Sequence, residues 1–437
     1  MLLQSHFIGF LARQSKFVQR KSKLDGEHFA TMMVFAKGSL ADTALWELCE
    51  EFRYNNTENI KKQSLHERFN EYAVTFLKLL LENVLTRQID TDGIKELLPR
   101  QKRIKIKDST SFQLPEHLRD IYPGSGGKTS KACVKIQFEY DLKSGKVTDL
   151  SIGGFTTTDL TNSHQSKDSI EANDLIIRDL GFIGLGFLKI IQEKHAFFLN
   201  RIKSNVSLWR KNTKGLFEPL GLAKVEKQMR KGKTATRQFT VYLGKEKSVQ
   251  CRLIIECLPP EVSAEKLRRA KRAAQREGRT LGKDTLSRIG LNLFVTNMSD
   301  EDLPMKNVWP LYRLRWQIEL VFKVFKSVAQ INKIKKVKRH RFECYLYGKL
   351  IWALLGWDVY WKLTSGTFAL GKTISINKMM KSFRRLCWRT INHNNKTMEQ
   401  KMGVLEKFVE NVFENCLLEK RKDKLSSMEI IKQLCQI

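Results

Sequence analysis

The sequence lacks the features that would identify a zinc-binding, secreted or membrane protein. Its eight cysteines are scattered, with no Cys-x2-Cys pair and no Cys/His cluster at zinc spacing, which argues against a structural zinc site. The N-terminus has no charged segment followed by a long apolar run, so no secretory signal is predicted. Charged residues interrupt the most apolar window, 346–363, so we expect a buried helix rather than a membrane span. The sequence thus predicts reduced thiols and a cytoplasmic protein.

Acidic residues are scarce relative to basic ones. The 437 residues include 78 Lys and Arg but only 46 Asp and Glu, which gives a net charge of +32. This exceeds what solubility requires and predicts a polyanionic partner, of which nucleic acid is the leading candidate. The alternative is that the chain is itself a basic membrane-surface or ribosomal protein. The glycines of segment 123–127 lack the spacing of a phosphate-binding Walker loop, including at Gly127-Lys128-Thr129. A hydrophobic content of 42% allows two or more domains with a large core.

The segment from Tyr312 to Lys326 carries polar residues at a spacing that a buried helix would not need. On a helix turning about 100° per residue, measured from Tyr312, Arg315 falls near roughly −60°, Glu319 near roughly −20° and Lys326 near roughly −40°. Apolar residues recur at spacings of three and four, as a buried face requires. An ordinary solvated face would give a similar pattern. The functional interpretation is that the carboxylate holds a metal ion while its basic neighbours hold phosphates.

Two further acids follow predicted strands. Asp108 ends an alternating strand that begins near Arg103, and Asp179 ends the short apolar strand from residue 174. A hairpin over 133–152 lies between them. A three-strand meander, a fourth strand ending in an acid and a helix carrying an acid is the order expected of an RNase H-like core. Such a core uses two divalent ions held by carboxylates. An Asp at a strand end more often serves a turn or a helix cap, so neither Asp is diagnostic alone.

Three blocks of sequence together resemble a known family. Tyr312, Arg315, Glu319 and Lys326 match the pattern Tyr-x2-Arg-x3-Glu-x6-Lys, the YREK signature of the DDE transposases of bacterial insertion sequences, in the group founded on insertion sequence 4. The stretch Lys107-Asp108-Ser109-Thr110 with Leu114-Pro115 resembles the first catalytic block. The stretch Arg178-Asp179-Leu180-Gly181-Phe182 with Phe198-Leu199-x-Arg201 resembles the second. The resemblance covers roughly residues 25 to 420 and is strongest in these blocks.

The predicted fold class is α/β. We expect an RNase H-like catalytic core, a mixed sheet with flanking helices, interrupted by a β-rich insertion domain and bounded by helical N- and C-terminal regions. The expected divisions are a helical DNA-binding region over 1–100, core over 101–204, insertion domain over 205–300, core again over 301–370 and a helical C-terminal region over 371–437. In the first region, one helix is predicted from Ser64 through Leu80. In the insertion, the basic helix 264–276 is a candidate phosphate contact.

The resemblance implies a function and a set of site residues. The function is cut-and-paste transposition, with binding of terminal inverted repeats, cleavage, a DNA hairpin intermediate and strand transfer into target DNA. Asp108, Asp179 and Glu319 would be the catalytic residues and would hold two Mg2+ ions, for which Mn2+ can substitute. Tyr312, Arg315 and Lys326 would bind DNA phosphates.

The hairpin step and the partners leave several points open. A flipped base often stacks on an aromatic side chain; Trp209 and Trp309 are candidates, whereas we expect Trp316 to be packed beside the signature. Synapsis of two double-stranded DNA ends implies a dimer, and the helices after residue 375 are a candidate dimer surface by position only. A non-catalytic DNA-binding derivative and a related RNase H-like nuclease are the alternative functions.

Overall fold

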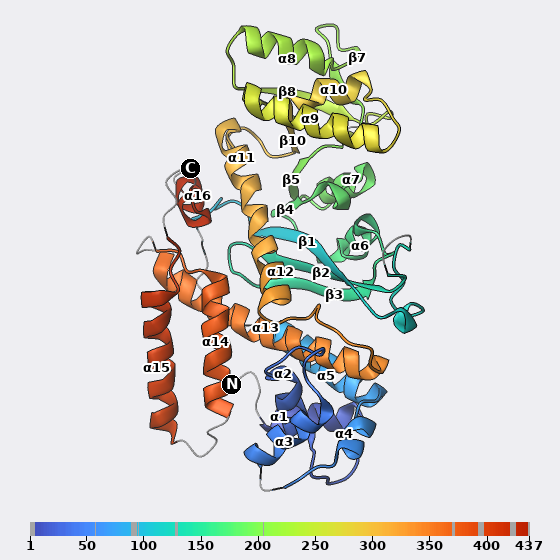
Figure 1. Ribbon diagram of the computed structural model, residues 1–437. Helices are drawn as coiled ribbons and strands as arrows, with labels where there is room; N and C mark the ends of the chain where they lie inside the picture. The colour runs from blue at the N-terminus through green and yellow to red at the C-terminus, as the bar shows by residue number, and fades with distance from the viewer. Residues whose placement is uncertain are drawn as a thin grey trace.

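In the residues that the structure describes, the protein is a mixed α/β structure built on a ten-stranded sheet. The computed structural model describes residues 5–56, 58–88, 94, 96–126, 130–203, 205–368, 372–391, 397–419 and 425–435, and Gly127-Lys128-Thr129 lie outside them. The strand order is β3-β2-β1-β4-β5-β10-β9-β8-β6-β7. Helices lie along the sheet and at both ends of the molecule (Figure 1). The predicted α/β class with a mixed sheet and flanking helices is therefore confirmed.

The first half of the sheet contains the predicted meander. Strands β1 (Arg103–Gln113), β2 (Cys133–Asp141) and β3 (Val147–Gly154) pair antiparallel. Strand β4 (Asp174–Arg178) pairs parallel to β1, and β5 (Phe197–Arg201) pairs parallel to β4. The β2–β3 turn requires glycine, because Gly145 has φ +76° and a Cβ there would lie 2.3 Å from the Trp361 ring.

The second half of the sheet arises from the range predicted to be β-rich. It contains β6 (Leu208–Lys211), β7 (Phe217–Pro219), β8 (Thr236–Leu243), β9 (Val249–Cys257) and β10 (Leu291–Thr296). Strand β10 pairs antiparallel with β5, so these strands extend the same sheet. Helices α8 (Leu222–Lys231), α9 (Pro260–Arg276) and α10 (Lys283–Ile289) flank them in the upper lobe of Figure 1. Whether this range is a separate insertion domain stays a prediction.

The two faces of β1 and β2 are covered by different helices. On one face lie α12 (Gln317–Ser327), which follows α11 (Met305–Arg313), and α13 (Arg339–Phe368). There Phe138 of β2 packs edge-on against Phe325 and Trp357. On the other face lie α6 (Asp159–Gln165), the 3-10 turn Lys167–Ser169 and α7 (Leu185–Glu193). Because strand side chains alternate between faces, successive residues of β1 enter different environments.

The N-terminal helices pack against α13 at the lower end of the molecule (Figure 1). They are α1 (Ser5–Gln14), α2 (Gly26–Val34), α3 (Leu45–Asn55), α4 (Lys62–Arg68) and α5 (Glu71–Thr86). The single helix predicted from Ser64 through Leu80 is wrong. It is divided into α4 and α5, because the Asn70 side chain accepts a hydrogen bond from the Ala73 N–H and begins a new helix.

The C-terminal region is helical, as expected. Helices α14 (Ile376–Ile391) and α15 (Met398–Asn415) form a hairpin beside the core, and α16 (Ser427–Leu434) lies next to α11 (Figure 1). The apolar window 346–363 lies within α13 and is mostly buried, which confirms the predicted buried helix. No helix within the described ranges has the length and apolar character to cross a membrane. The eight cysteines are free thiols.

Candidate active site

The register of two parallel strands brings Asp108 and Asp179 together. The β1–β4 ladder runs from Arg103 opposite Asp174 to Lys107 opposite Arg178. Asp108 and Asp179 directly follow this last pair along the chain, so both lie where the parallel pairing ends. Strand β4 ends at Arg178, one residue before the predicted end, and Asp179 precedes the 3-10 turn Leu180–Phe182.

The expectation that Asp108 ends its strand is wrong. Strand β1 continues to Gln113, because its pairing with β2 extends beyond its pairing with β4. Asp108 therefore stands in the middle of a strand, at the position where one of its two neighbouring strands turns away.

Glu319 is presented by the first turn of α12. The predicted continuous helix from Tyr312 to Lys326 is wrong, because the 3-10 turn Leu314–Trp316 separates α11 from α12. A 3-10 turn winds more tightly than an α-helix, so angles calculated for an ideal helix do not hold across it. The turn carries Arg315, whose side chain links α12 to strand β1.

Arg315 connects two of the three acids. Its Nη1 donates to Asp108 Oδ2 at 2.6 Å, and its Nη2 donates to Glu319 Oε1 at 3.4 Å. The Arg315 side chain is 9% exposed, whereas that of Glu319 is 47% exposed. Burial lowers the pKa of Arg315, but Asp108, Tyr312, Asp179 and Glu319 outweigh burial, so its pKa is raised overall. All three acids therefore act on one guanidinium.

The Asp108 carboxyl is partly buried, and burial shifts its pKa. Burial raises its pKa to about 6, the repulsion of Asp179 and Glu319 acts in the same direction, and the Ser109 N–H and Arg315 oppose the rise. Ser109 N donates to Asp108 Oδ1 at 2.8 Å. A bound cation strongly stabilises the ionised form of a carboxyl group that is partly desolvated and close to two other acids. Such a shift is typical of a functional site.

Two further residues of the predicted set lie beside this centre but are engaged by protein. Tyr312 is 3% exposed and packs on Phe294, with the ring centroids 5.2 Å apart. Burial raises the pKa of Tyr312 to about 12. Lys326 Nζ donates to Ser111 O at 2.9 Å and so ties the end of α12 to β1. Binding of DNA phosphates by either residue stays a prediction.

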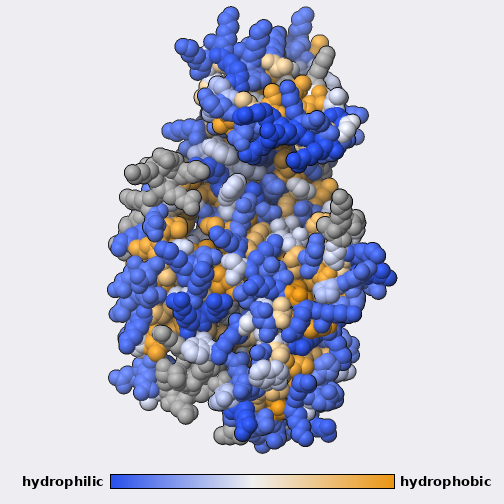
Figure 2. All heavy atoms as spheres, in the orientation of Figure 1, coloured by the Kyte–Doolittle hydropathy of each residue, from blue (hydrophilic) through white to orange (hydrophobic). Residues whose placement is uncertain are grey.

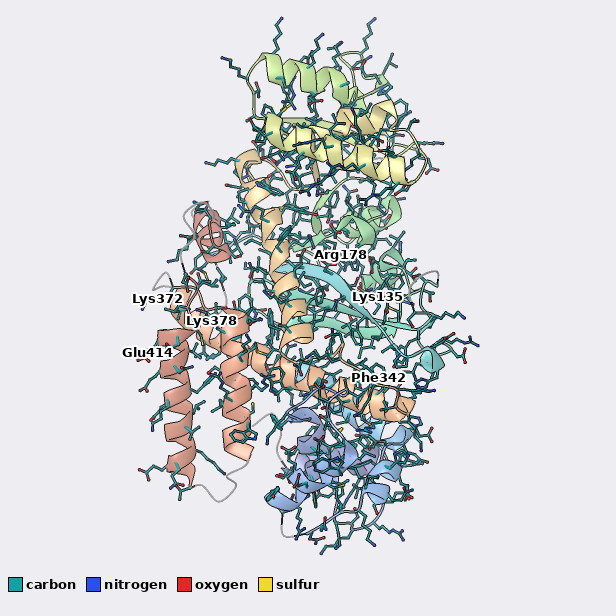
Figure 3. The ribbon with its side chains drawn as sticks, viewed as in Figure 1. Lys135, Arg178, Phe342, Lys372, Lys378 and Glu414 are labelled. Carbon is teal, nitrogen blue, oxygen red and sulfur yellow. The ribbon has the colours of Figure 1, made fainter. Side chains whose placement is uncertain are left out.

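A buried ionic network on the opposite face of the sheet was not predicted. Glu139 of β2 accepts from Lys105 Nζ at 2.8 Å and from Arg178 Nη2 at 2.7 Å, and all three side chains are fully buried. Lys107 Nζ reaches Asp149 of β3 at 2.6 Å. Arg178 lies on the part of the sheet near α6, as Figure 3 shows. The sequence feature that could have revealed this network is the basic residue directly before each aspartate, Lys107 and Arg178. Neighbouring side chains on a strand point to opposite faces of the sheet, so these cations point away from the aspartates.

The prediction that Trp316 is packed beside the signature is wrong, whereas base stacking on Trp209 or Trp309 stays a prediction. Trp316 is 62% exposed rather than packed, because the 3-10 turn directs its side chain to solvent next to Arg315. Trp309 is 38% exposed and contacts Phe294, at 5.7 Å between ring centroids. The indole nitrogen of Trp209 is buried. Trp316 is therefore the most accessible of the three indoles.

The donor set is chemically suited to a hard divalent cation. Three carboxylates supply the oxygen ligands that Mg2+ prefers, and Mg2+ keeps several waters, so few protein ligands are needed. In the described residues, however, no three Asp, Glu, His or Cys side chains are gathered closely enough to hold a metal ion. The Arg315 guanidinium, bonded to both Asp108 and Glu319, is the cation that these acids share in this structure.

Comparison with known proteins gives the class of this protein. A family model described as "Transposase DDE domain" matches residues 99–355, a range that contains all three acids. The chain therefore belongs to the DDE transposases, which are enzymes that act on DNA.

Individual relatives are transposases of insertion sequences. The chain is 36% identical over 362 residues to the transposase for insertion sequence element IS231F of Bacillus thuringiensis subsp. israelensis, covering 79% of this chain and 75% of the relative. It is 32% identical over 362 residues to the transposase for IS1151 of Clostridium perfringens, covering 80% and 76%. A weaker similarity, 24% over 266 residues, is to the putative transposase InsL for IS186A of Escherichia coli (strain K12), covering 59% and 66%.

Proposed function

We propose that this protein moves an insertion sequence by cut-and-paste transposition and belongs to the group founded on insertion sequence 4. The observation that carries the proposal is the β1–β4 register, which puts Asp108 and Asp179 side by side while Arg315 links Asp108 to Glu319. The strand order β3-β2-β1-β4-β5 supports an RNase H-like core. The strands between 205 and 300 would then be an insertion that prolongs the sheet of that core.

The three acids would be the catalytic residues and would hold the metal. Two Mg2+ ions, or Mn2+ in their place, would activate the attacking water or hydroxyl and stabilise the leaving oxygen. Asp108 and Asp179 would supply ligands from strands, and Glu319 would supply one from a helix. Because Asp108 and Asp179 come from neighbouring strands of a single sheet, the distance between them would vary little. The distance from Glu319 to these two acids would depend on the position of α12.

The DNA would contact the basic groups around these acids. Arg315 and Lys326 would bind phosphates near the cleaved bond, and the exposed Trp316 indole could stack on a base displaced during hairpin formation. Helix α9 would contact phosphates elsewhere, since its exposed cations outnumber its acids. The substrates would be the terminal inverted repeats and the target duplex, and two protein copies would bring the two ends together.

The experiment that tests this function is cleavage of a duplex that carries the element's terminal inverted repeat, with and without Mg2+, on a denaturing gel. We expect metal-dependent cleavage at the repeat boundary. Glu319→Gln should abolish it and retain binding of the repeat, because the amide keeps the shape but loses the charge that holds the metal. Glu301→Gln, an exposed acid before α11, is the matched control and should cleave normally.

Three other results would point elsewhere. Normal cleavage by Glu319→Gln would reject the proposed site. Binding of the repeat without cleavage by the wild type, in Mg2+ or Mn2+, would favour a non-catalytic DNA-binding derivative. Cleavage of branched DNA regardless of repeat sequence would favour a related RNase H-like nuclease.

A further inference from the structure

The Arg315 guanidinium occupies one oxygen of Asp108, a proposed metal ligand. Both oxygens of Asp108 are engaged, Oδ1 by the Ser109 N–H at 2.8 Å and Oδ2 by Arg315 Nη1 at 2.6 Å. The second guanidinium nitrogen is 3.4 Å from Glu319 Oε1. The same positive group therefore serves as the counter-ion of two proposed ligands, one on the sheet and one on the helix.

A divalent ion and this guanidinium compete for the same oxygens. A metal ion that binds Asp108 Oδ2 must displace Nη1, and it is repelled by the positive charge if the arginine stays close. Displacement is costly, since the side chain is 9% exposed and its pairing with Asp108 is partly buried. A buried ion that loses its partner is strongly destabilised. The arginine needs another anion before it leaves these acids.

A DNA phosphate is the anion best suited to take the guanidinium. The planar fork of arginine binds phosphate through two parallel hydrogen bonds, as it binds carboxylate. Glu319 is half exposed, so the guanidinium lies at the border between the core and the surface where DNA would arrive. Lys326, seven residues after Glu319 in α12 and bonded to Ser111 O, adds positive charge to the same helix as Glu319.

We propose that Arg315 is an internal counter-ion that keeps the metal site closed in the DNA-free protein and opens it when a phosphate takes the guanidinium. This inference rests on the proposed function, in which Asp108 and Glu319 are metal ligands. It predicts that DNA raises the affinity for the metal and that the metal raises the affinity for DNA by the same factor, because coupling between two binding sites is reciprocal. The free transposase then has little metal-dependent nuclease activity on DNA that does not reach Arg315.

The test measures Mn2+ binding by the full-length protein without DNA, from the electron paramagnetic resonance signal of free Mn2+ at about pH 8, where Asp108 is ionised. Arg315→Gln should bind Mn2+ about tenfold or more tightly than the wild type, within the usual range of coupling. Lys323→Gln removes an exposed charge from α12, the helix that carries Glu319, and is the matched control, with wild-type affinity expected. Equal affinity of wild type and Arg315→Gln would overturn the proposal.

A duplex carrying the terminal repeat supplies the second arm. Adding it should raise the Mn2+ affinity of the wild type by a factor similar to that of the substitution, and should raise that of Arg315→Gln much less. If Arg315→Gln fails to fold, Arg315→Lys replaces it; a lysine keeps the charge but not the fork, so an intermediate affinity is expected. Enhancement by DNA that is equal with and without the arginine would also contradict the counter-ion role.

The double variant Arg315→Gln/Glu319→Gln separates this inference from the proposed function. If it binds Mn2+ as tightly as Arg315→Gln, Glu319 is not a ligand and the proposed site itself fails. If Glu319→Gln weakens Mn2+ binding in both backgrounds while Arg315→Gln has no effect, the ligands are correct and only the counter-ion role is wrong.

Discussion

Lys107 and Arg178 stand opposite each other in the last register pair of the parallel strands β1 and β4, and each directly precedes a proposed metal ligand. Both side chains are fully buried on the face of the sheet away from the acids. Burial lowers the pKa of each cation. Two adjacent buried cations are tolerated only because Glu139 and Asp149 neutralise them from β2 and β3. The network thus ties four strands together directly beside Asp108 and Asp179.

Glu139→Gln should destabilise the protein strongly. Burial alone raises the pKa of Glu139, but Arg178, Lys105 and Lys107 lower it more, so this carboxyl is held ionised. Without its charge, buried cations lose their partner, at a cost of about 3–5 kcal/mol in the free energy of unfolding. Urea denaturation measures the loss. The control is Glu265→Gln, an exposed acid paired with Arg269 within α9, for which about 0.5 kcal/mol or less is expected. A small effect at Glu139 would show that the network contributes little.

Removal of charge from α9 should weaken DNA binding and make it less dependent on salt. Lys271 and Arg272 are exposed, and hydrophilic side chains cover the lobe formed by α8 and α9 (Figure 2). If both contact phosphates, Lys271→Gln/Arg272→Gln should reduce the slope of log affinity against log salt by about 2. Fluorescence anisotropy with a terminal-repeat duplex over a range of salt concentrations measures the slope.

The matched control for α9 removes the same charge from α15. Lys401→Gln/Lys407→Gln changes two exposed lysines of that helix, and the slope should stay at its wild-type value. An equal reduction in both double variants would mean that net charge, rather than a contact made by α9, governs binding.

Lys349→Met should change how stability depends on pH. Lys349 of α13 donates to Ala36 O, and burial lowers its pKa to about 7, with Arg384 acting in the same direction and Glu51 opposing. Unfolded lysine titrates near about pH 10.4. Between these values the unfolded chain binds more protons, so the free energy of unfolding rises with pH, by up to about 1.4 kcal/mol per unit from this group.

The substitution removes that contribution. The free energy of unfolding of Lys349→Met relative to the wild type should therefore be highest at about pH 6, where the buried charge of Lys349 is most destabilising. This difference should shrink as pH rises towards about 10. Urea denaturation at several pH values measures the difference. Lys362→Met, an exposed lysine on the same helix, should follow the wild-type pH profile. A constant difference between Lys349→Met and wild type would mean that Lys349 does not titrate in this range.

Local patterns in the sequence determined much of the architecture. The alternation that begins at Arg103, the hairpin over 133–152 and the apolar strand ending at Asp179 all correspond to observed strands, because period-two hydrophobicity and turn residues act over short distances. The sequence predicted the ends of the helices less accurately. The sequence did not reveal the break at Asn70, where a side-chain cap outweighs a continuous apolar stripe, or the 3-10 turn at Leu314–Trp316.

The sequence by itself determined which residues are the candidates for the proposed site: Asp108, Asp179 and Glu319, with Arg315 close to Glu319 in the chain. Only the tertiary structure decided what each one contacts. The pairing of Arg315 with Asp108 spans 207 positions, and the pairing of Glu139 with Arg178 depends on strands that meet only in the folded sheet. Spacing along a chain specifies a face of one helix or strand, whereas strand register and helix packing specify the partner across the core, and that partner sets charge, burial and access to metal.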